Sequence, residues 1–176
     1  GCRGVLLPAR TDLPVRTAPA QLARDDVTRC LSHRDGFVEL TDALWNWRRR
    51  DRPASLPVEC VLVGDGEGVA TAALCRADFV RSGAPSLGLA LTDLSVPETV
   101  EPAEVIGAIA GARAGPLPLT WLVAECNERE VSAAVSLGLS PLPECAMVCA
   151  LSPRGVSALG QPVGAWYTPV ESVLGV

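Results

Sequence analysis

Lysine is absent from this 176-residue sequence, and all fifteen basic residues are arginine. Twenty acidic residues outnumber them and give a formal net charge of −5 at pH 7. A protein that binds nucleic acid by neutralising phosphates needs an excess of positive charge. The charge balance therefore argues against that class, and we expect no nucleic-acid partner.

Long apolar runs are also missing. No stretch of eighteen or more apolar residues occurs, so the sequence predicts no membrane-spanning helix. The opening residues GCRGVLLPAR are interrupted by Pro8 and Arg10 too early to form the apolar core of a signal peptide. We therefore expect a cytoplasmic protein without membrane contact.

Metal-ligating patterns are scarce. His33 is the sole histidine, and the seven cysteines form no C-x-x-C pair. Such scattered cysteines are typical of buried, reduced thiols that act as small apolar residues. We expect neither a metal site nor a disulfide framework.

The composition that remains is that of an ordinary globular domain. Hydrophobic residues make up 48 % of the sequence and charged residues 20 %, which is enough for one compact core. We place one folded domain at residues 13–151, after a lead-in at 1–12. Residues 152–176 are expected to be an extension anchored by Trp166 and Tyr167.

Periodicity in the first half predicts a strand and two helices. A strand at 13–19 precedes a helix at 20–33, in which Leu22, Val27 and Leu31 have helical spacing. A second helix is predicted at 36–50. Its apolar face is expected to carry Phe37, Leu40, Leu44 and Trp47.

The second half predicts a hairpin followed by a crossover. Two β-rich runs at 58–80 flank Asp65-Gly66, a pair typical of tight hairpin turns. The elements expected after the hairpin are a strand at 86–96, a helix from Pro102 to Gly115, a strand at 118–126, a helix at 127–138 and a strand at 144–152. This order predicts a mixed α/β (α+β) fold with a mostly antiparallel sheet, flanking helices and a βαβ crossover at 87–125. Strands 87–96 and 118–126 should be parallel and separate at their C-terminal ends.

Three stretches of these elements resemble the GNAT superfamily of acyl-coenzyme A N-acyltransferases. They are the hairpin VECVLVGDGEGVATAAL, the strand end Asp93-Leu94-Ser95-Val96-Pro97-Glu98, and the segment from Glu125-Cys126-Asn127 to Gly138-Leu139. The resemblance implies an α/β acyltransferase fold, an acetyl-CoA or other acyl-CoA cofactor, and an amine acceptor.

The resemblance also implies roles for individual residues. The backbone of Leu94, Ser95 and Val96 would pair with the pantetheine arm, and Asn127 would lie on the other side of the cofactor cleft. Asp93 would be a general base, and Glu125 would bind the acceptor amine. A structural role is open for both: Asp93 as a helix cap and Glu125 as a solvated strand end.

The expected phosphate-binding loop departs from the family pattern. Residues Val100 to Val105 stand where the family has a basic or Gln residue and spaced glycines. Pro102 has no N–H to donate, and Glu98, Glu101 and Glu104 would repel phosphates. Acidic residues there suit the positive end of a helix dipole, so we interpret the segment as a helix start. Ala134 stands where many members have a proton-donating tyrosine.

A basic patch follows the second predicted helix, from Arg48 to Arg52. We interpret it as surface cations at a helix C-terminus beside one core tryptophan; the alternative is a site for an anion or acidic partner.

Two functions remain open. The first is an N-acyltransferase, acetylating an amine, with an atypical and impaired CoA pyrophosphate loop. The second is a non-catalytic GNAT-fold domain that binds a protein partner or second domain. It would be the degenerate half of a tandem pair or a relative similar to ornithine decarboxylase antizyme.

Overall fold

The computed structural model describes residues 2–4, 12–34, 37–49, 58–65, 70–81, 84–121, 123 and 127–141. Its strands are β1 (Cys2–Gly4), β2 (Val15–Thr17), β3 (Val58–Val63), β4 (Ala70–Arg81), β5 (Ala84–Ser95), β6 (Leu119–Trp121) and β7 (Ser140–Pro141). Its helices are α1 (Ala20–Leu31), α2 (Asp42–Arg49), α3 (Pro102–Ile109), the π-helical segment η1 (Ala110–Ala114) and α4 (Glu128–Ser136).

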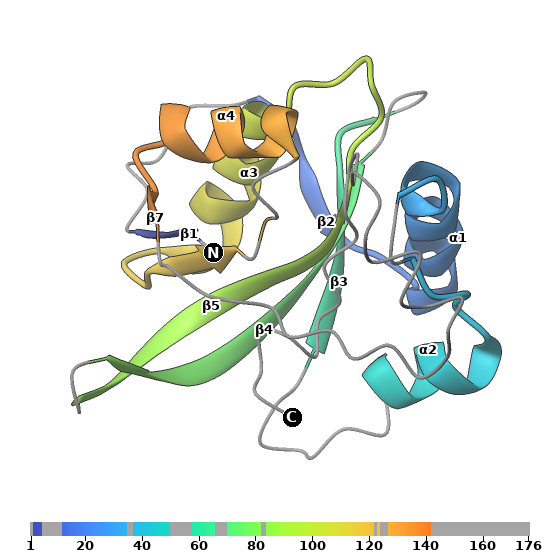
Figure 1. Ribbon diagram of the computed structural model, residues 1–176, viewed down its shortest axis with the longest axis horizontal. Helices are drawn as coiled ribbons and strands as arrows, with labels where there is room; N and C mark the ends of the chain where they lie inside the picture. Colours follow the sequence, from blue (N-terminus) through green and yellow to red (C-terminus); the bar gives the residue numbers. More distant parts are fainter. Residues whose placement is uncertain are drawn as a thin grey trace, which may run out of the picture.

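All these strands belong to one mixed sheet with the order β2-β3-β4-β5-β6-β1-β7 (Figure 1). Every neighbouring pair is antiparallel except β5 and β6, which α3 and η1 connect as a βαβ crossover. The predicted α+β fold with a mostly antiparallel sheet is therefore confirmed. The parallel pairing runs from Leu89–Leu119 to Leu91–Trp121. Residues 122 and 124–126 lie outside the described part, so the separation of the strand ends stays a prediction.

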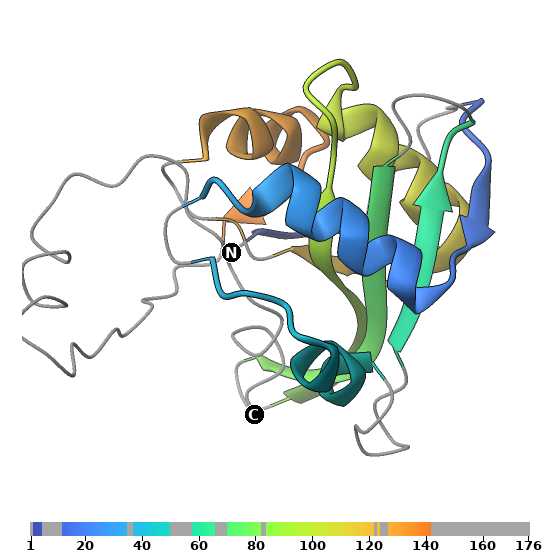
Figure 2. The same ribbon diagram turned by 90° about the vertical axis from the view of Figure 1, so that its right-hand side faces the viewer.

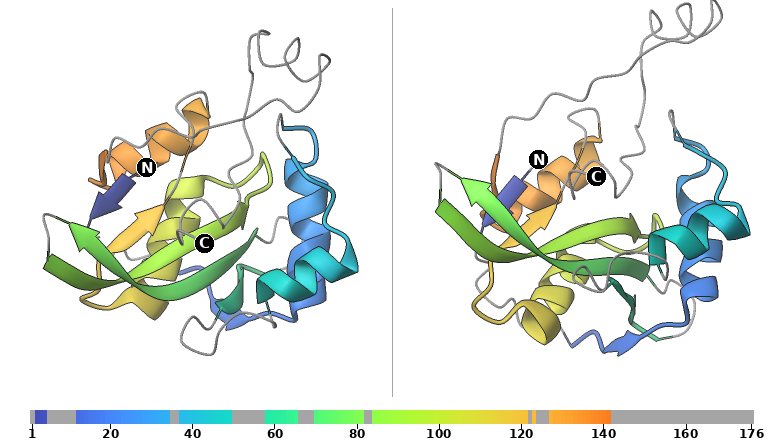
Figure 3. Two further views of the ribbon diagram at one scale, coloured as in Figure 1. Left: turned by 60° about the horizontal axis from the view of Figure 1, so that its bottom comes forward. Right: turned by 90° about the horizontal axis from the view of Figure 1, so that it is seen from below.

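The sheet carries a helical layer on each face. Figure 2 shows α1 in front of the strands and α3 with η1 behind them. Successive side chains along a strand point to opposite faces of the sheet, so the strands contribute apolar residues to a core on each face. In β3, Val61 and Val63 face the α3 layer, whereas Cys60 packs with α1 and α2. Figure 3 shows β4 and β5 as one long twisted ribbon, with α1 and α2 gathered at the end away from the β4–β5 turn.

The predicted hairpin exists, but its turn is not the tight one expected at Asp65-Gly66. Val63 pairs with Ala70, so the connection runs from residue 64 to residue 69. Gly64 leaves the strand with a φ of 88°, and its N–H donates to the Pro14 carbonyl. The chain therefore turns away before Asp65.

Helix α2 begins at Asp42 rather than at residue 36. The Thr41 hydroxyl accepts from the Leu44 N–H at 3.2 Å and so caps its first turn. This start fixes which face is buried: Trp45 is 2 % exposed and Trp47 is 41 % exposed. The prediction of Trp47 in the core was wrong.

Helix α1 also differs in one core position. Ala23, Val27 and Leu31 are buried, as a period of three to four residues requires. Leu22, which was grouped with Val27 and Leu31 by its spacing, lies on a different side of the helix and is 41 % exposed.

The predicted ends of the last two helices are confirmed. Pro102 opens α3, and Gly115, with a φ of 56°, follows η1. Gly138 ends α4 with a φ of 74°. The N–H groups of Gly138 and Leu139 return to the carbonyls of Val135 and Ala134 at 2.9 and 3.0 Å, which is a Schellman motif.

The N-terminal strand was not foreseen. Cys2–Gly4 lies between β6 and β7 in the sheet, inside the segment expected to be a lead-in. The expected strand at 144–152 and the extension at 152–176 lie outside the described residues. Within the described part of the chain, no helix has the length and apolarity needed to cross a bilayer.

Candidate functional site

The candidate site lies at the C-terminal ends of β5 and β6, where residues 96–101 lead into α3 and where α4 begins (Figure 1). Ligands of open sheets bind outside the carboxyl ends of parallel strands. The fold brings Asp93, Leu94, Ser95 and Val96 to this end on β5, and Asn127 at the start of α4. Glu125 lies outside the described residues.

A β-bulge shapes the end of β5. Thr71 pairs with Ser95 and Ala73 with Thr92, so Asp93 and Leu94 together oppose one residue of β4. Asp93 has a φ of 46°, a left-handed conformation that aspartate tolerates better than most residues. A bulge re-aims the side chains that follow it, and such strain is concentrated at functional positions.

The re-aimed side chains have internal partners. Leu94 is buried in the core on the α3 face, and Val96 packs against that core. The Ser95 hydroxyl donates to the Asp26 carbonyl of α1 at 3.0 Å. The side chains of these three residues are therefore structural, and any role of their backbone toward pantetheine stays a prediction.

Asp93 is not presented to solvent. Its side chain is 1 % exposed and forms an ion pair with Arg48 of α2, whose side chain is 4 % exposed; Oδ1 and Nη1 are 4.0 Å apart. An acceptor amine cannot reach a carboxylate buried in this way. The structure also excludes the expected helix cap, because Asp93 lies within β5.

Arg48 corrects the interpretation of the basic patch. It was expected at the surface, yet it is buried against the sheet. The signal was present in the sequence, because Arg48 follows Leu44 by four residues and Trp45 by three, which places all three on one helix face. Arg49 ends α2, and residues 50–52 lie outside the described part.

Buried hydroxyls line the same face of the sheet. Thr92 donates to the Ala73 carbonyl at 3.3 Å. Thr71 is fully buried, and its Oγ1 has no hydrogen-bond partner among the described residues. Since Ala70 and Ala72 face the α3 core, Thr71 points to the side of α1 and α2. Buried hydroxyls thus accompany the apolar residues on this face of the sheet.

The loop after β5 turns its carbonyl groups toward a cation. Nη2 of Arg129, in the first turn of α4, donates to the carbonyls of Pro97 at 3.0 Å, Glu98 at 3.4 Å and Val100. A phosphate-binding loop needs the opposite arrangement, with N–H groups converging on an anion. Sequence reasoning missed Arg129 because it lies 29 residues beyond Val100.

The start of α3 is acidic and lacks a free donor at its first position. Pro102 occupies that position, and the N–H groups of Glu104 and Val105 already donate to the Glu101 carbonyl. Glu98 and Glu101 are exposed, as is Glu104. The predicted acidic helix start is therefore confirmed.

The start of α4 is tied to the rest of the domain. Asn127 is the N-cap residue and is buried, and its side chain makes no capping hydrogen bond. Glu130, in the first turn, pairs with Arg34 just beyond α1, and both side chains are mostly buried. Ala134 is fully buried in the core, so this position serves packing.

The described residues contain no group of three or more histidine, cysteine or acidic side chains placed to hold a metal ion. Cys60 and Cys75 are buried thiols outside any disulfide, and Cys30 is a half-buried one. No protein-family model matches the chain, and no curated protein matches it either.

Proposed function

We propose that the chain is a GNAT-like acyl-CoA N-acyltransferase domain with an impaired cofactor site. Three features at one end of the sheet support this proposal. They are the βαβ crossover from β5 to β6, the bulge at Asp93, and two helices that begin beside the ends of these strands. In this proposal, acetyl-CoA or another acyl-CoA binds between the strand ends.

The main support for an impaired cofactor site is the geometry of the loop at 97–100. Its carbonyl groups converge on Arg129, and the acidic side chains of Glu98 and Glu101 stand beside it. Carbonyl oxygens and carboxylates both repel a pyrophosphate. We therefore expect acyl-CoA to bind with a dissociation constant on the order of 10 to 100 µM or weaker.

The remaining contacts would come from the strand end. The backbone of Leu94, Ser95 and Val96 would pair with the amides of the pantetheine arm, and Asn127 would line the other side. The side chains of these β5 residues are already packed, so their contribution to the cofactor is limited to backbone hydrogen bonds.

The chemistry would be a direct transfer. The acceptor amine attacks the thioester carbonyl carbon, a C–N bond forms and the C–S bond breaks. Asp93 would take the amine proton, and coenzyme A would leave as a thiolate protonated by solvent, because Ala134 has no proton to give. Asp93 must first be released from Arg48, so the state described here is inactive.

A loop exchange tests the proposal. Val100→Arg, Glu101→Gly and Ala103→Gly together restore a basic residue and flexible amides, and should tighten coenzyme A binding at least about tenfold in calorimetry. Glu39→Gln, an exposed acidic position before α2 and outside the proposed site, is the control and should change binding little. An exchange variant that binds no better than the unmodified protein would refute the impaired-loop explanation.

A non-catalytic, protein-binding GNAT-fold domain is the second candidate. The burial of Asp93 against Arg48 favours it, because a general base with permanent internal pairing has no catalytic use. Such a domain would bind a protein partner or a second domain. Absence of coenzyme A binding in the exchange variant, together with absence of acyl transfer at millimolar acetyl-CoA, would support this candidate.

A further inference from the structure

The first turn of α4 contacts two parts of the domain that are distant in the sequence. Arg129 donates to the carbonyls of the 97–100 loop. The next residue, Glu130, pairs with Arg34, which lies three residues beyond the end of α1. Helix α4 packs through Ala134 into the core on the α3 face, whereas α1 packs on the other face of the sheet. The turn therefore joins a loop of one layer to the helix end of the other.

The ion pair between Arg34 and Glu130 is shielded from solvent. The two side chains are 17 % and 13 % exposed, and Nε of Arg34 is buried without a hydrogen-bond partner among the described residues. An exposed ion pair contributes little to stability, but removing one partner of a buried pair leaves a charge without compensation. The end of α1 is therefore firmly attached to the first turn of α4.

The helix itself gives this turn little support. Asn127 is the N-cap residue, and its side chain makes no capping hydrogen bond. With nine residues, α4 is shorter than a helix that is stable by itself in water. A helix without a side-chain cap frays more readily at its first turn. The contacts of Arg129 and Glu130 thus favour the folded turn over a frayed one.

We propose that the first turn of α4 is a coupling element between the end of α1 and the 97–100 loop. When one contact is lost, the turn frays more often and the other contact is weakened with it. The coupling is reciprocal, because both contacts bias the same equilibrium. A ligand or partner that draws Arg34 away from Glu130 would release the loop of the candidate site. The inference goes beyond the proposed function, since it holds for any ligand of that site.

Hydrogen exchange of an Arg34 variant tests the coupling from the α1 side. The reporter is the Val100 amide of the loop, which donates to the Pro97 carbonyl at 3.1 Å. Arg34→Met should raise the exchange rate of this amide at least about threefold, because Glu130 no longer holds the turn folded.

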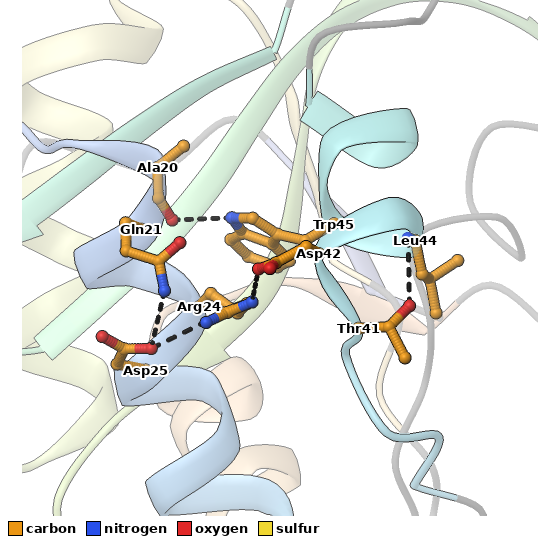
Figure 4. Close-up of polar contacts among 8 residues, drawn as sticks. All are labelled: Ala20, Gln21, Arg24, Asp25, Thr41, Asp42, Leu44 and Trp45. Atoms are coloured by element: carbon orange, nitrogen blue, oxygen red, sulfur yellow. Dashed lines mark hydrogen bonds and ion pairs between the residues drawn. The ribbon is translucent and has the colours of Figure 1, made fainter.

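Arg24→Met is the matched control (Figure 4). Arg24 also lies on α1, and its side chain is 21 % exposed, but it pairs with Asp25 and Asp42 rather than with α4. This variant removes a partly buried cation from the same helix and should leave the exchange rate of the Val100 amide unchanged.

The reverse experiment uses Arg129→Ala and remains decisive if Arg34→Met fails to fold. Its reporters are the amides of Arg34 and Phe37, which donate to the carbonyls of Leu31 and Arg34 at 3.0 and 3.2 Å. Both amides should exchange at least about threefold faster, because the coupling acts in both directions.

Three results would overturn the inference. The first is a folded Arg34→Met variant in which the Val100 amide exchanges at its original rate. The second is an Arg129→Ala variant in which the amides of Arg34 and Phe37 keep theirs. The third is an equal acceleration of the Val100 amide by Arg24→Met and Arg34→Met, which would indicate general destabilisation. None of these experiments contains coenzyme A, so their failure is distinct from failure of the proposed function.

Discussion

Asp93 combines two unfavourable features at one position. Its backbone has a φ of 46°, and its carboxylate is removed from water beside Arg48. A left-handed conformation costs about 1–2 kcal/mol for most residues and less for Asp and Asn. The aspartate therefore has a conformational role and an electrostatic role, which substitutions can separate.

Asp93→Asn and Asp93→Ala separate these roles. Both remove the charge that faces the buried Arg48, which we expect to cost about 3 kcal/mol or more of unfolding free energy. Alanine should cost about 1 kcal/mol beyond asparagine, because it lacks the tolerance for positive φ. Urea unfolding measures both. Equal losses for the two variants would show that the backbone at this position is unstrained.

The pairing itself can be measured by a double-mutant cycle. Arg48→Met keeps an unbranched apolar chain and removes one charge of the ion pair, whereas Arg48→Met with Asp93→Asn removes both. We expect the double variant to lose about 2 kcal/mol less than the sum of the single losses. Additive losses would mean that the two charges do not interact.

Arg48 also shows where residue-level prediction from sequence stops. In the run Arg48-Arg49-Arg50 the residues are chemically identical, and helical phase alone distinguishes the buried one. That phase depends on where α2 begins, which the Thr41 cap fixes. An expected helix start six residues too early also put Trp47 on the buried face, where the structure has Trp45.

At the scale of elements, Gly138 is required by the end of α4. Its φ of 74° is strained for any residue with a side chain, although a methyl group there would meet no atom within 4 Å. Gly138→Ala should therefore cost about 1 kcal/mol through conformation alone. Gly111 is the matched control, because it also faces open space and has no positive φ. Thermal unfolding should show Gly111→Ala as neutral or slightly stabilising; similar losses at both sites would contradict this reason.

The loop between β5 and α3 depends on a side chain from another element. Arg129→Ala removes the donor shared by the carbonyls of residues 97, 98 and 100, so the amides of this loop should exchange at least about tenfold faster. Arg113→Ala, which removes the half-buried ion pair to Glu59, should leave the loop unchanged. Unaltered loop exchange in the Arg129 variant would mean that the loop holds its own shape.

Local signals predicted the elements where their determinants are local. Pro102, Gly115 and Gly138 mark helix ends, and the apolar strand–helix–strand order predicted the parallel crossover. The sequence offered no comparable signal for Cys2–Gly4, because a three-residue strand is defined by the two strands that it joins. The contacts in the candidate site could not be predicted for the same reason, because the residues that contact Asp93 and the 97–100 loop are distant from them in sequence.

At the scale of the whole molecule, the sheet and its two helical layers form the domain for which we propose a GNAT-like function. Two arginines make internal contacts near the end of β5. Arg48 pairs with the candidate base, and Arg129 engages the loop carbonyls. Both contacts are internal to the domain. The central claim is therefore that this end of the sheet is an impaired and closed acyl-CoA site.

Calorimetric titration of coenzyme A into the unmodified protein tests this claim most directly. We predict a dissociation constant on the order of 10 to 100 µM or weaker, because the loop meets the pyrophosphate with carbonyl groups and carboxylates. Submicromolar binding would contradict the account, since it would require converging N–H donors that residues 97–105 do not present in the described state.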